Sequence, residues 1–175
     1  VAIVGIEKLI PSLEDLDLFL PLLATLGTGQ NITVYNNILF GPKTAAEPDG
    51  PEEMYVILID NGRTEVLGHL EQRSALTCIR CGACLNGCPI YRSIGGYSYG
   101  AVYSGPIGSV ISPHYLGLKE YNHLSFASSL CGKCTEVCPV KIPLHELLLH
   151  NRHDAVSRRY TTFMWRKVVS AWKTV

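Results

Sequence analysis

The first 77 residues alternate between apolar runs and polar breaks in a way that predicts strands joined by a helix and a loop. Residues 1–6 (VAIVGI) are almost continuously apolar, as expected of a strand covered on both faces. Residues 31–40 and 54–60 predict further strands, and the Asn61-Gly62 pair predicts a hairpin turn into a strand over residues 63–67. This half therefore predicts a piece of an α/β sheet.

A helix is predicted between the first two of these strands. Leucines recur at helical spacing over residues 13–23, and Ser12 with Asp15 three residues later predicts an N-cap with an acidic first turn. The helix is expected to end at Gly27 and to be kinked or split by Pro21. Residues 41–53, rich in Pro, Gly and charged side chains, predict a loop.

The second half of the chain has a different pattern. Residues 89–130 contain many glycines and tyrosines and predict a long loop, which either covers a redox centre with aromatic rings or packs on the neighbouring α/β piece. Residues 114–129 predict a helix at the end of that segment, and a long basic helix is predicted after Pro143. Its basic side chains favour docking to an acidic protein partner over nucleic acid, and peripheral contact with a membrane stays open.

The distribution of charge also divides the 175 residues near residue 77. The chain has 15 basic and 15 acidic side chains, but residues 1–77 hold 4 and 11, a net charge of −7, which leaves +7 for the rest. We therefore expect a fold of the α+β class in three parts: 1–70 as an α/β piece, 71–150 as a metal-binding domain and 151–175 as a basic amphipathic helix. No apolar stretch reaches the roughly 20 residues of a transmembrane helix, so none is expected. No secretory leader precedes Val1, and the apolar start suggests a chain cut from something longer.

All seven cysteines lie in the basic half, and an odd number cannot pair completely into disulfides. The first four form the run CIRCGACLNGCP, with Cys78, Cys81, Cys84 and Cys88 spaced as C-x2-C-x2-C-x3-C and followed by Pro89. This spacing is typical of ferredoxins, in which three thiolates hold one iron–sulfur cluster and the fourth holds another. A structural zinc site, which uses two separated pairs of ligands, is the less favoured interpretation.

The second run, CGKCTEVCP, repeats this spacing with one cysteine missing. Cys131, Cys134 and Cys138 are followed by Pro139, and Ser128 stands where a complete run would have its first cysteine. The exchange of ligands between two clusters then predicts two sets. The expected ligands are Cys78, Cys81, Cys84 and Cys138 for cluster one, and Cys88, Cys131 and Cys134 for cluster two.

Cluster one is therefore expected to be a [4Fe-4S] cluster with four thiolates, whereas cluster two lacks one. Cluster two could be a [3Fe-4S] cluster, or a [4Fe-4S] cluster whose last iron takes Ser128, a water or a ligand from elsewhere in a longer chain. A serine at this position more often forms hydrogen bonds than binds a metal. No nucleophile or general base stands out near the cysteines, so no catalytic residue is assigned.

The chain resembles the iron–sulfur B subunits of bacterial lactate-utilisation complexes, in which a LUD-type α/β domain precedes a ferredoxin-like domain. The resemblance rests on CIRCGACLNGCPIYRSIGG, VYSGPIGSVISP and SSLCGKCTEVCPVKIP, and on VAIVGIEKLIPSLEDL and NGRTEVL upstream. It implies that the chain is a C-terminal fragment of an electron-transfer subunit of a cytoplasmic L-lactate oxidation system, with companion subunits as partners. Two alternatives stay open. The chain could be an electron-transfer subunit of another dehydrogenase or of a disulfide reductase, or it could be a structural metal-binding module.

Overall fold

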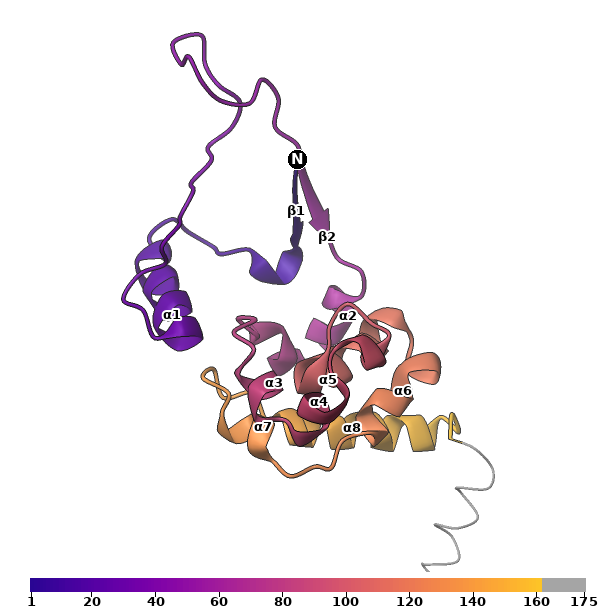
Figure 1. Cartoon of the computed structure of the whole chain (residues 1–175). Helices are drawn as coiled ribbons and strands as arrows, with labels where there is room; N and C mark the ends of the chain where they lie inside the picture. The colour runs from indigo at the N-terminus through magenta and orange to yellow at the C-terminus, as the bar shows by residue number, and fades with distance from the viewer. Residues whose placement is uncertain (162–175) are drawn as a thin grey trace, which may run out of the picture. The chain divides into compact units, whose positions relative to one another are not determined.

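The computed structural model describes residues 1–161, which form two compact units. The first unit comprises Val1–Glu65 together with Ile79–Cys81, and the second comprises Val66–Cys78 and the chain from Gly82 onward. Figure 1 shows the helices and strands of both units. None of the helices in this part of the chain is both long enough and apolar enough to cross a membrane.

The first unit contains a sheet of two parallel strands. Its elements are β1 (Ala2–Gly5), the 3-10 helix η1 (Ile6–Lys8), α1 (Leu16–Thr28) and β2 (Val56–Ile59). Strands β1 and β2 pair in parallel, with Ala2 opposite Val56 and Gly5 opposite Ile59, so the strands predicted at residues 1–6 and 54–60 are confirmed (Figure 1). Parallel strands need a crossover connection, and α1 lies within it.

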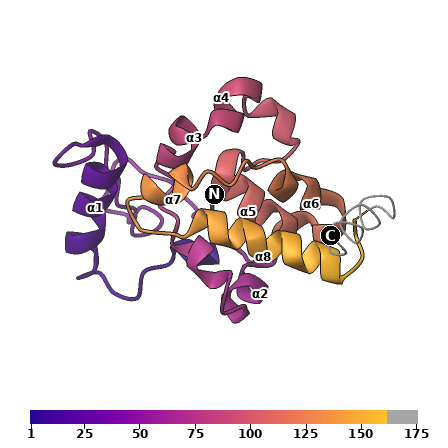
Figure 2. The same ribbon diagram turned by 90° about the horizontal axis from the view of Figure 1, so that it is seen from below.

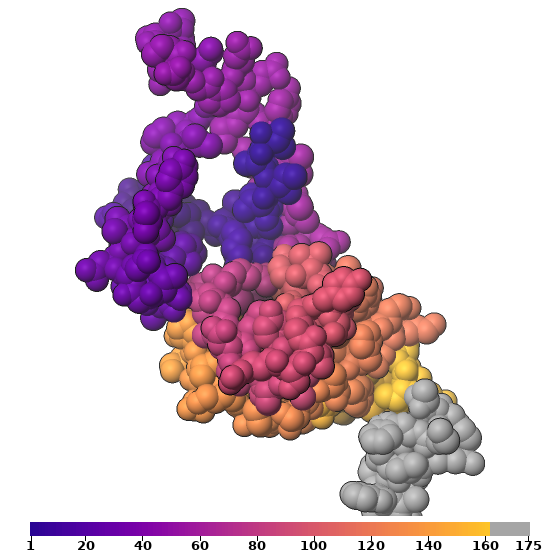
Figure 3. All heavy atoms as spheres, viewed as in Figure 1, coloured from indigo at the N-terminus to yellow at the C-terminus, as the bar shows by residue number. Residues whose placement is uncertain are grey.

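Apolar side chains of this small sheet are exposed. Ile3 is 64% exposed, and every residue of β2 is also exposed. The space-filling view shows an open gap between β1 and α1, so the helix does not cover this strand (Figure 3). Strands this apolar normally have a layer on each face, and the described residues of the first unit supply none for β2.

The strand predicted at residues 31–40 is wrong. These residues form no strand, and apolar side chains such as Val34 and Phe40 are about nine-tenths exposed, at 91% and 90%. A strand is stable only when its backbone pairs with a neighbour. The apolar run at residues 31–40 meets no such partner in the described chain.

The hairpin predicted at Asn61-Gly62 is also wrong, because a helix follows β2. Both residues have the positive φ that a tight hairpin turn requires, 41° and 84°. They lead, however, into α2 (Arg63–Gly68), whose Thr64 N–H donates to the Asp60 carboxylate at 2.7 Å. Asp60 thus satisfies a free amide at the start of the helix, as an N-cap residue does.

Helix α1 is present but begins later and ends later than predicted. Its N-cap is Asp15, and the Ser12 hydroxyl donates to the Asp15 carboxylate at 3.0 Å instead of capping the helix. The helix runs through Pro21 without dividing, although a proline inside a helix removes an amide donor and crowds the preceding turn. It passes Gly27 and ends at Gly29, whose φ of 72° is the left-handed conformation common after helices.

The second unit is built from helices. Its elements are η2 (Arg73–Thr77), α3 (Ala83–Gly87), α4 (Pro89–Ile94), η3 (Tyr97–Tyr99), α5 (Gly105–Leu116), α6 (Leu118–Phe126), α7 (Lys133–Glu136) and α8 (Leu144–Ser157). Helix α5 packs against α3, α6 and α8, and the view from below shows α8 alongside α5 and α6 (Figure 2). The α+β class is therefore confirmed, with a small sheet and many helices.

The long loop predicted for residues 89–130 is wrong, because α4, η3, α5 and α6 lie there. Every residue of α5 from Gly105 to Pro113 is buried. A helix buried on all sides has no polar face, so its sequence lacks the 3.6-residue period that identifies amphipathic helices. The helix predicted at residues 114–129 corresponds to α6, which Gly117 separates from α5.

Glycine at position 108 is required by the close packing of α5. A Cβ atom added at Gly108 would lie 2.1 Å from the Tyr103 carbonyl oxygen, which is far inside van der Waals contact. The glycines that suggest a loop in the sequence thus allow a helix to approach its neighbours closely.

Helix α8 confirms the helix predicted after Pro143. Leu144, Leu147 and Leu148 are each 1% exposed and belong to the core of the second unit. The helix ends at Ser157, and the remainder of the predicted basic helix, from residue 162, lies outside the described residues.

A buried asparagine on α8 joins four segments of the second unit. The Asn151 carbonyl oxygen accepts from Gln72 Nε2 at 2.9 Å and lies 3.0 Å from His114 Nε2. Its amide nitrogen donates to the Val110 carbonyl at 2.9 Å and to the Ser125 hydroxyl at 3.2 Å. Because Asn151 is fully buried, these bonds form in a low-dielectric interior where an unmade bond is costly.

We predict that Asn151→Leu lowers the free energy of unfolding by about 2–4 kcal/mol, because it leaves several buried polar groups without partners. Urea unfolding followed by circular dichroism measures the change. The control His150→Leu alters an exposed neighbour on the same helix and should change stability by less than about 0.5 kcal/mol. Equal effects of the two substitutions would contradict the role given to this hydrogen-bond network.

Candidate metal centre

The two cysteine runs have the same backbone conformation. In each run, the residues on either side of one cysteine have positive φ. These residues are Arg80 and Gly82 around Cys81 (φ 63° and 78°), and Leu130 and Gly132 around Cys131 (φ 54° and 77°). The left-handed conformation is uncommon outside glycine, so its occurrence at Arg80 and Leu130 marks a turn that the surrounding structure imposes.

A short helix follows this turn in each run. The Gly82 carbonyl accepts amide bonds of 2.9 and 3.2 Å from the residues three and four positions ahead, at the start of α3. The Gly132 carbonyl accepts equivalent bonds of 3.0 and 3.2 Å at the start of α7. The second run thus repeats the first in three dimensions, with Ser128 at the position that corresponds to Cys78.

Helices α3 and α7 pack against each other in the second unit. Gly87 of α3 permits the approach, since an added Cβ would lie 3.3 Å from Cγ of Lys133 and 3.5 Å from a methyl group of Val137. The two cysteine-bearing helices therefore lie side by side, as two adjacent redox centres require.

None of the seven cysteines is paired in a disulfide. Cys84, Cys134 and Cys138 lie in the hydrophobic core of the second unit and Cys78 packs against it, whereas Cys131 is exposed. Cys81 belongs to the segment grouped with the first unit. In the part of the chain that the structure describes, no three Cys, His, Asp or Glu side chains are grouped as they would be around a single metal ion.

The donor chemistry of the runs fits iron–sulfur clusters. Cysteine thiols are the ligands that such clusters use, and backbone amides donate to several of the sulfur atoms. The Tyr91 N–H donates to Cys88 Sγ at 3.5 Å, and the Ile142 N–H donates to Cys138 Sγ at 3.4 Å. Amide–sulfur hydrogen bonds of this kind stabilise thiolates and raise the reduction potential of a cluster.

Pro89 explains the direction of the Cys88 side chain. Cys88 is the N-cap of α4 and Pro89 occupies the first helical position, where its missing N–H costs nothing. The Cys88 sulfur therefore faces the free amides at the start of α4.

The thiols of the second run differ in acidity. Hydrogen bonds from the Lys133 backbone N–H and the Ser129 hydroxyl lower the pKa of Cys131. Burial raises the pKa of Cys134 above the ordinary value of a thiol. Cys131 is thus more readily deprotonated than Cys134, and a thiolate is the form that binds metal.

Ser128 is held in a tight turn. Its hydroxyl accepts the Leu130 N–H at 3.1 Å, and its carbonyl accepts a 2.6 Å bond from the Arg152 guanidinium. Arg152 also donates to the Ser125 carbonyl at 2.9 Å and lies 5.5 Å above the Phe126 ring. Arg152 thus fixes the segment leading into the second run, a role that sequence reasoning missed because it counted this arginine only among the basic residues of the predicted helix.

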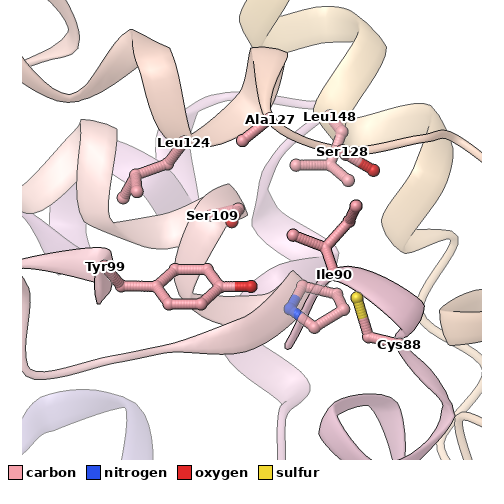
Figure 4. A pocket seen from close by; sticks show the side chains of 9 residues that line it. Cys88, Ile90, Tyr99, Ser109, Leu124, Ala127, Ser128 and Leu148 are labelled. Carbon is pink, nitrogen blue, oxygen red and sulfur yellow. The ribbon is translucent and has the colours of Figure 1, made fainter. Parts of the chain in front are cut away.

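Cys88 and Ser128 line one pocket of the second unit, together with the side chain of Tyr99 (Figure 4). The other lining residues are Ile90, Pro106, Ser109, Leu124, Ala127 and Leu148. Burial and then the nearby Cys88 thiol raise the pKa of Tyr99 to about 12. Sequence reasoning did not single out Tyr99, because many tyrosines share its segment and only the packing distinguishes it.

We predict that Arg152→Gln lowers the free energy of unfolding by about 1–2 kcal/mol, because charge-assisted bonds to backbone carbonyls are lost at a half-buried site. Hydrogen exchange should also become faster at the amides of residues 126–130. The control Arg158→Gln replaces an exposed arginine just beyond α8 and should leave both measurements unchanged. Unaltered exchange in Arg152→Gln would show that this arginine does not hold the segment.

Two protein families match successive parts of the chain. Residues 1–59 match the LUD domain, and residues 74–142 match the 4Fe-4S dicluster domain, which contains all seven cysteines. No solved structure matches the chain.

Curated relatives match most of the chain. Lactate utilization protein B of Anoxybacillus flavithermus and that of Bacillus subtilis are each 49% identical over 158 residues. The protein of the same name from Bacillus cereus strain B4264 is 51% identical over 158 residues. Each alignment covers 90% of this chain and 33% of the relative. The chain is thus a homologue of the bacterial lactate utilization B proteins, spans about a third of their length, and joins a LUD domain segment to a 4Fe-4S dicluster domain.

Proposed function

We propose that this chain carries electrons in a bacterial system that oxidises L-lactate to pyruvate. The observation that supports the proposal most strongly is the repeated cysteine turn, which sets two metal-binding runs side by side on α3 and α7. The names of the relatives supply the connection to lactate.

Two iron–sulfur clusters are proposed as the cofactors. Cluster one, a [4Fe-4S] cluster, is assigned Cys78, Cys81, Cys84 and Cys138. Cluster two, either [4Fe-4S] or [3Fe-4S], is assigned Cys88, Cys131 and Cys134. The 4Fe-4S dicluster match supports the cofactor class, and the interleaved assignment follows from the position of the proline after the last cysteine of each run.

When bound, such clusters supply one-electron redox chemistry. The residues of this chain bury Cys84, Cys134 and Cys138, donate amide hydrogen bonds to Cys88 and Cys138, and keep the two runs adjacent through the packing of α3 on α7. Oxidation of lactate to pyruvate releases two electrons and two protons, so a pair of one-electron carriers suits this reaction. We assign the chain the role of an electron-carrying subunit of an oxidoreductase complex, with no catalytic residue of its own.

The proposed location is the cytoplasm, and the proposed partners are companion subunits of a lactate-utilisation complex. The opposite charges of the two halves, −7 for residues 1–77 and +7 for the rest, suit docking between acidic and basic protein surfaces. Nucleic acid is not among the proposed partners.

We predict that the anaerobically reconstituted chain is brown, contains iron and acid-labile sulfide, and loses its visible absorbance on reduction with dithionite. Cys78→Ser should lower the iron content by up to about half, because it removes a ligand of cluster one. The matched control Ser128→Ala changes the equivalent position of the second run and should retain the iron. A colourless zinc protein, or equal iron loss in the two variants, would contradict the ligand assignment.

The link to lactate needs a separate test with the full-length protein. Deletion of its gene should abolish growth on L-lactate, and reintroduction of the wild-type protein should restore growth. A protein with Cys78→Ser should fail to restore it, because the electron path is broken. Normal growth of the deletion strain on lactate, with loss of growth on another hydroxy acid, would instead assign the chain to a different dehydrogenase.

A further inference from the structure

One pocket of the second unit is lined by residues from both cysteine runs. Its wall includes Cys88, a proposed ligand of cluster two, and Ser128, which occupies the position of the missing cysteine (Figure 4). The two residues come from different runs and meet at one pocket. Any ligand that replaces the missing thiolate would therefore border this space.

Ser128 is poorly suited to be that ligand. Its hydroxyl oxygen already accepts the Leu130 N–H at 3.1 Å, and Arg152 holds its carbonyl at 2.6 Å. To bind iron as an alkoxide, Ser128 would have to lose a proton and give up this turn. A ligand from outside the chain requires neither change.

The size of the pocket limits what that ligand can be. The cavity volume is about 10 Å³, which is close to the minimum space that one water molecule requires. A three-carbon acid such as lactate does not fit. Most lining side chains are apolar, so few groups in the pocket can form a hydrogen bond with a small polar ligand.

Tyr99 supplies a polar group to this pocket. Its side chain is only 5% exposed, and Figure 4 shows its hydroxyl directed into the space between Ser109 and Ile90. A phenol is protonated at neutral pH and can donate one hydrogen bond.

We infer that the pocket holds one water-derived ligand, a water or hydroxide, that completes the coordination of a [4Fe-4S] cluster two and accepts a hydrogen bond from Tyr99. This inference rests on the proposed function, since it requires cluster two to be present. It distinguishes cluster two from cluster one by an exchangeable oxygen ligand. Tyr99 acts as a positioning residue for that ligand.

Electron–nuclear double resonance in water enriched with ¹⁷O tests the inference on the anaerobically reconstituted chain. The reduced protein should show an ¹⁷O coupling to one cluster. Ser128→Cys should abolish the coupling, because the new thiolate takes the place of the oxygen ligand. Tyr99→Phe should lower the amplitude of the coupling at least twofold, because the donated hydrogen bond is lost.

Tyr97→Phe is the matched control, since Tyr97 is fully exposed and lies outside the pocket. It should leave the coupling unchanged. A wild-type chain with two clusters but no ¹⁷O coupling would overturn the inference while leaving the proposed function intact, as would a [3Fe-4S] cluster two. Equal couplings in wild type and Tyr99→Phe would contradict the hydrogen bond that the inference assigns to Tyr99. A chain that assembles no cluster would overturn the proposed function itself.

Discussion

The second unit depends on the burial of helix α5. Every residue from Gly105 to Pro113 is buried, and α3, α6 and α8 all pack against the helix. Position 108 also has no space for a side chain, because the Tyr103 carbonyl of the segment leading into α5 lies too close. Because α3 carries Cys84 of the first cysteine run and α8 follows the second run, the burial of α5 links these two helices within the second unit.

The two runs share a backbone conformation but not the same number of cysteines. The same left-handed turn and short helix occur in each, so the fold treats them as equivalent. Ser128 breaks the equivalence: Arg152 donates to its carbonyl, and Ser128 also lines a small pocket. Under the proposed ligand assignment, these contacts surround the position at which cluster two lacks a thiolate.

The two cysteine runs could be recognised in the sequence because the spacing of cysteines that bind one cluster is fixed over a few residues of chain. Strands β1 and β2 and helix α8 were predictable for a similar reason, since each has a clear periodic or apolar pattern. Helix α5 could not be predicted, because burial on all sides removes the period. The hairpin predicted at Asn61-Gly62 was wrong because Asp, Asn and Gly are common both in hairpin turns and at the start of a helix, and here they precede α2. Tyr99 and Arg152 matter through tertiary contacts that no local pattern records.

The central claim is that the chain binds two clusters of unequal coordination. Mössbauer spectroscopy of the chain reconstituted with ⁵⁷Fe tests it most directly, because each iron reports its own ligands. The account predicts one iron site per chain with a non-thiolate ligand beside a majority of thiolate-ligated sites, and conversion of that site to the thiolate type in Ser128→Cys. A wild-type spectrum of two [4Fe-4S] clusters in which every iron has a thiolate ligand would contradict the account.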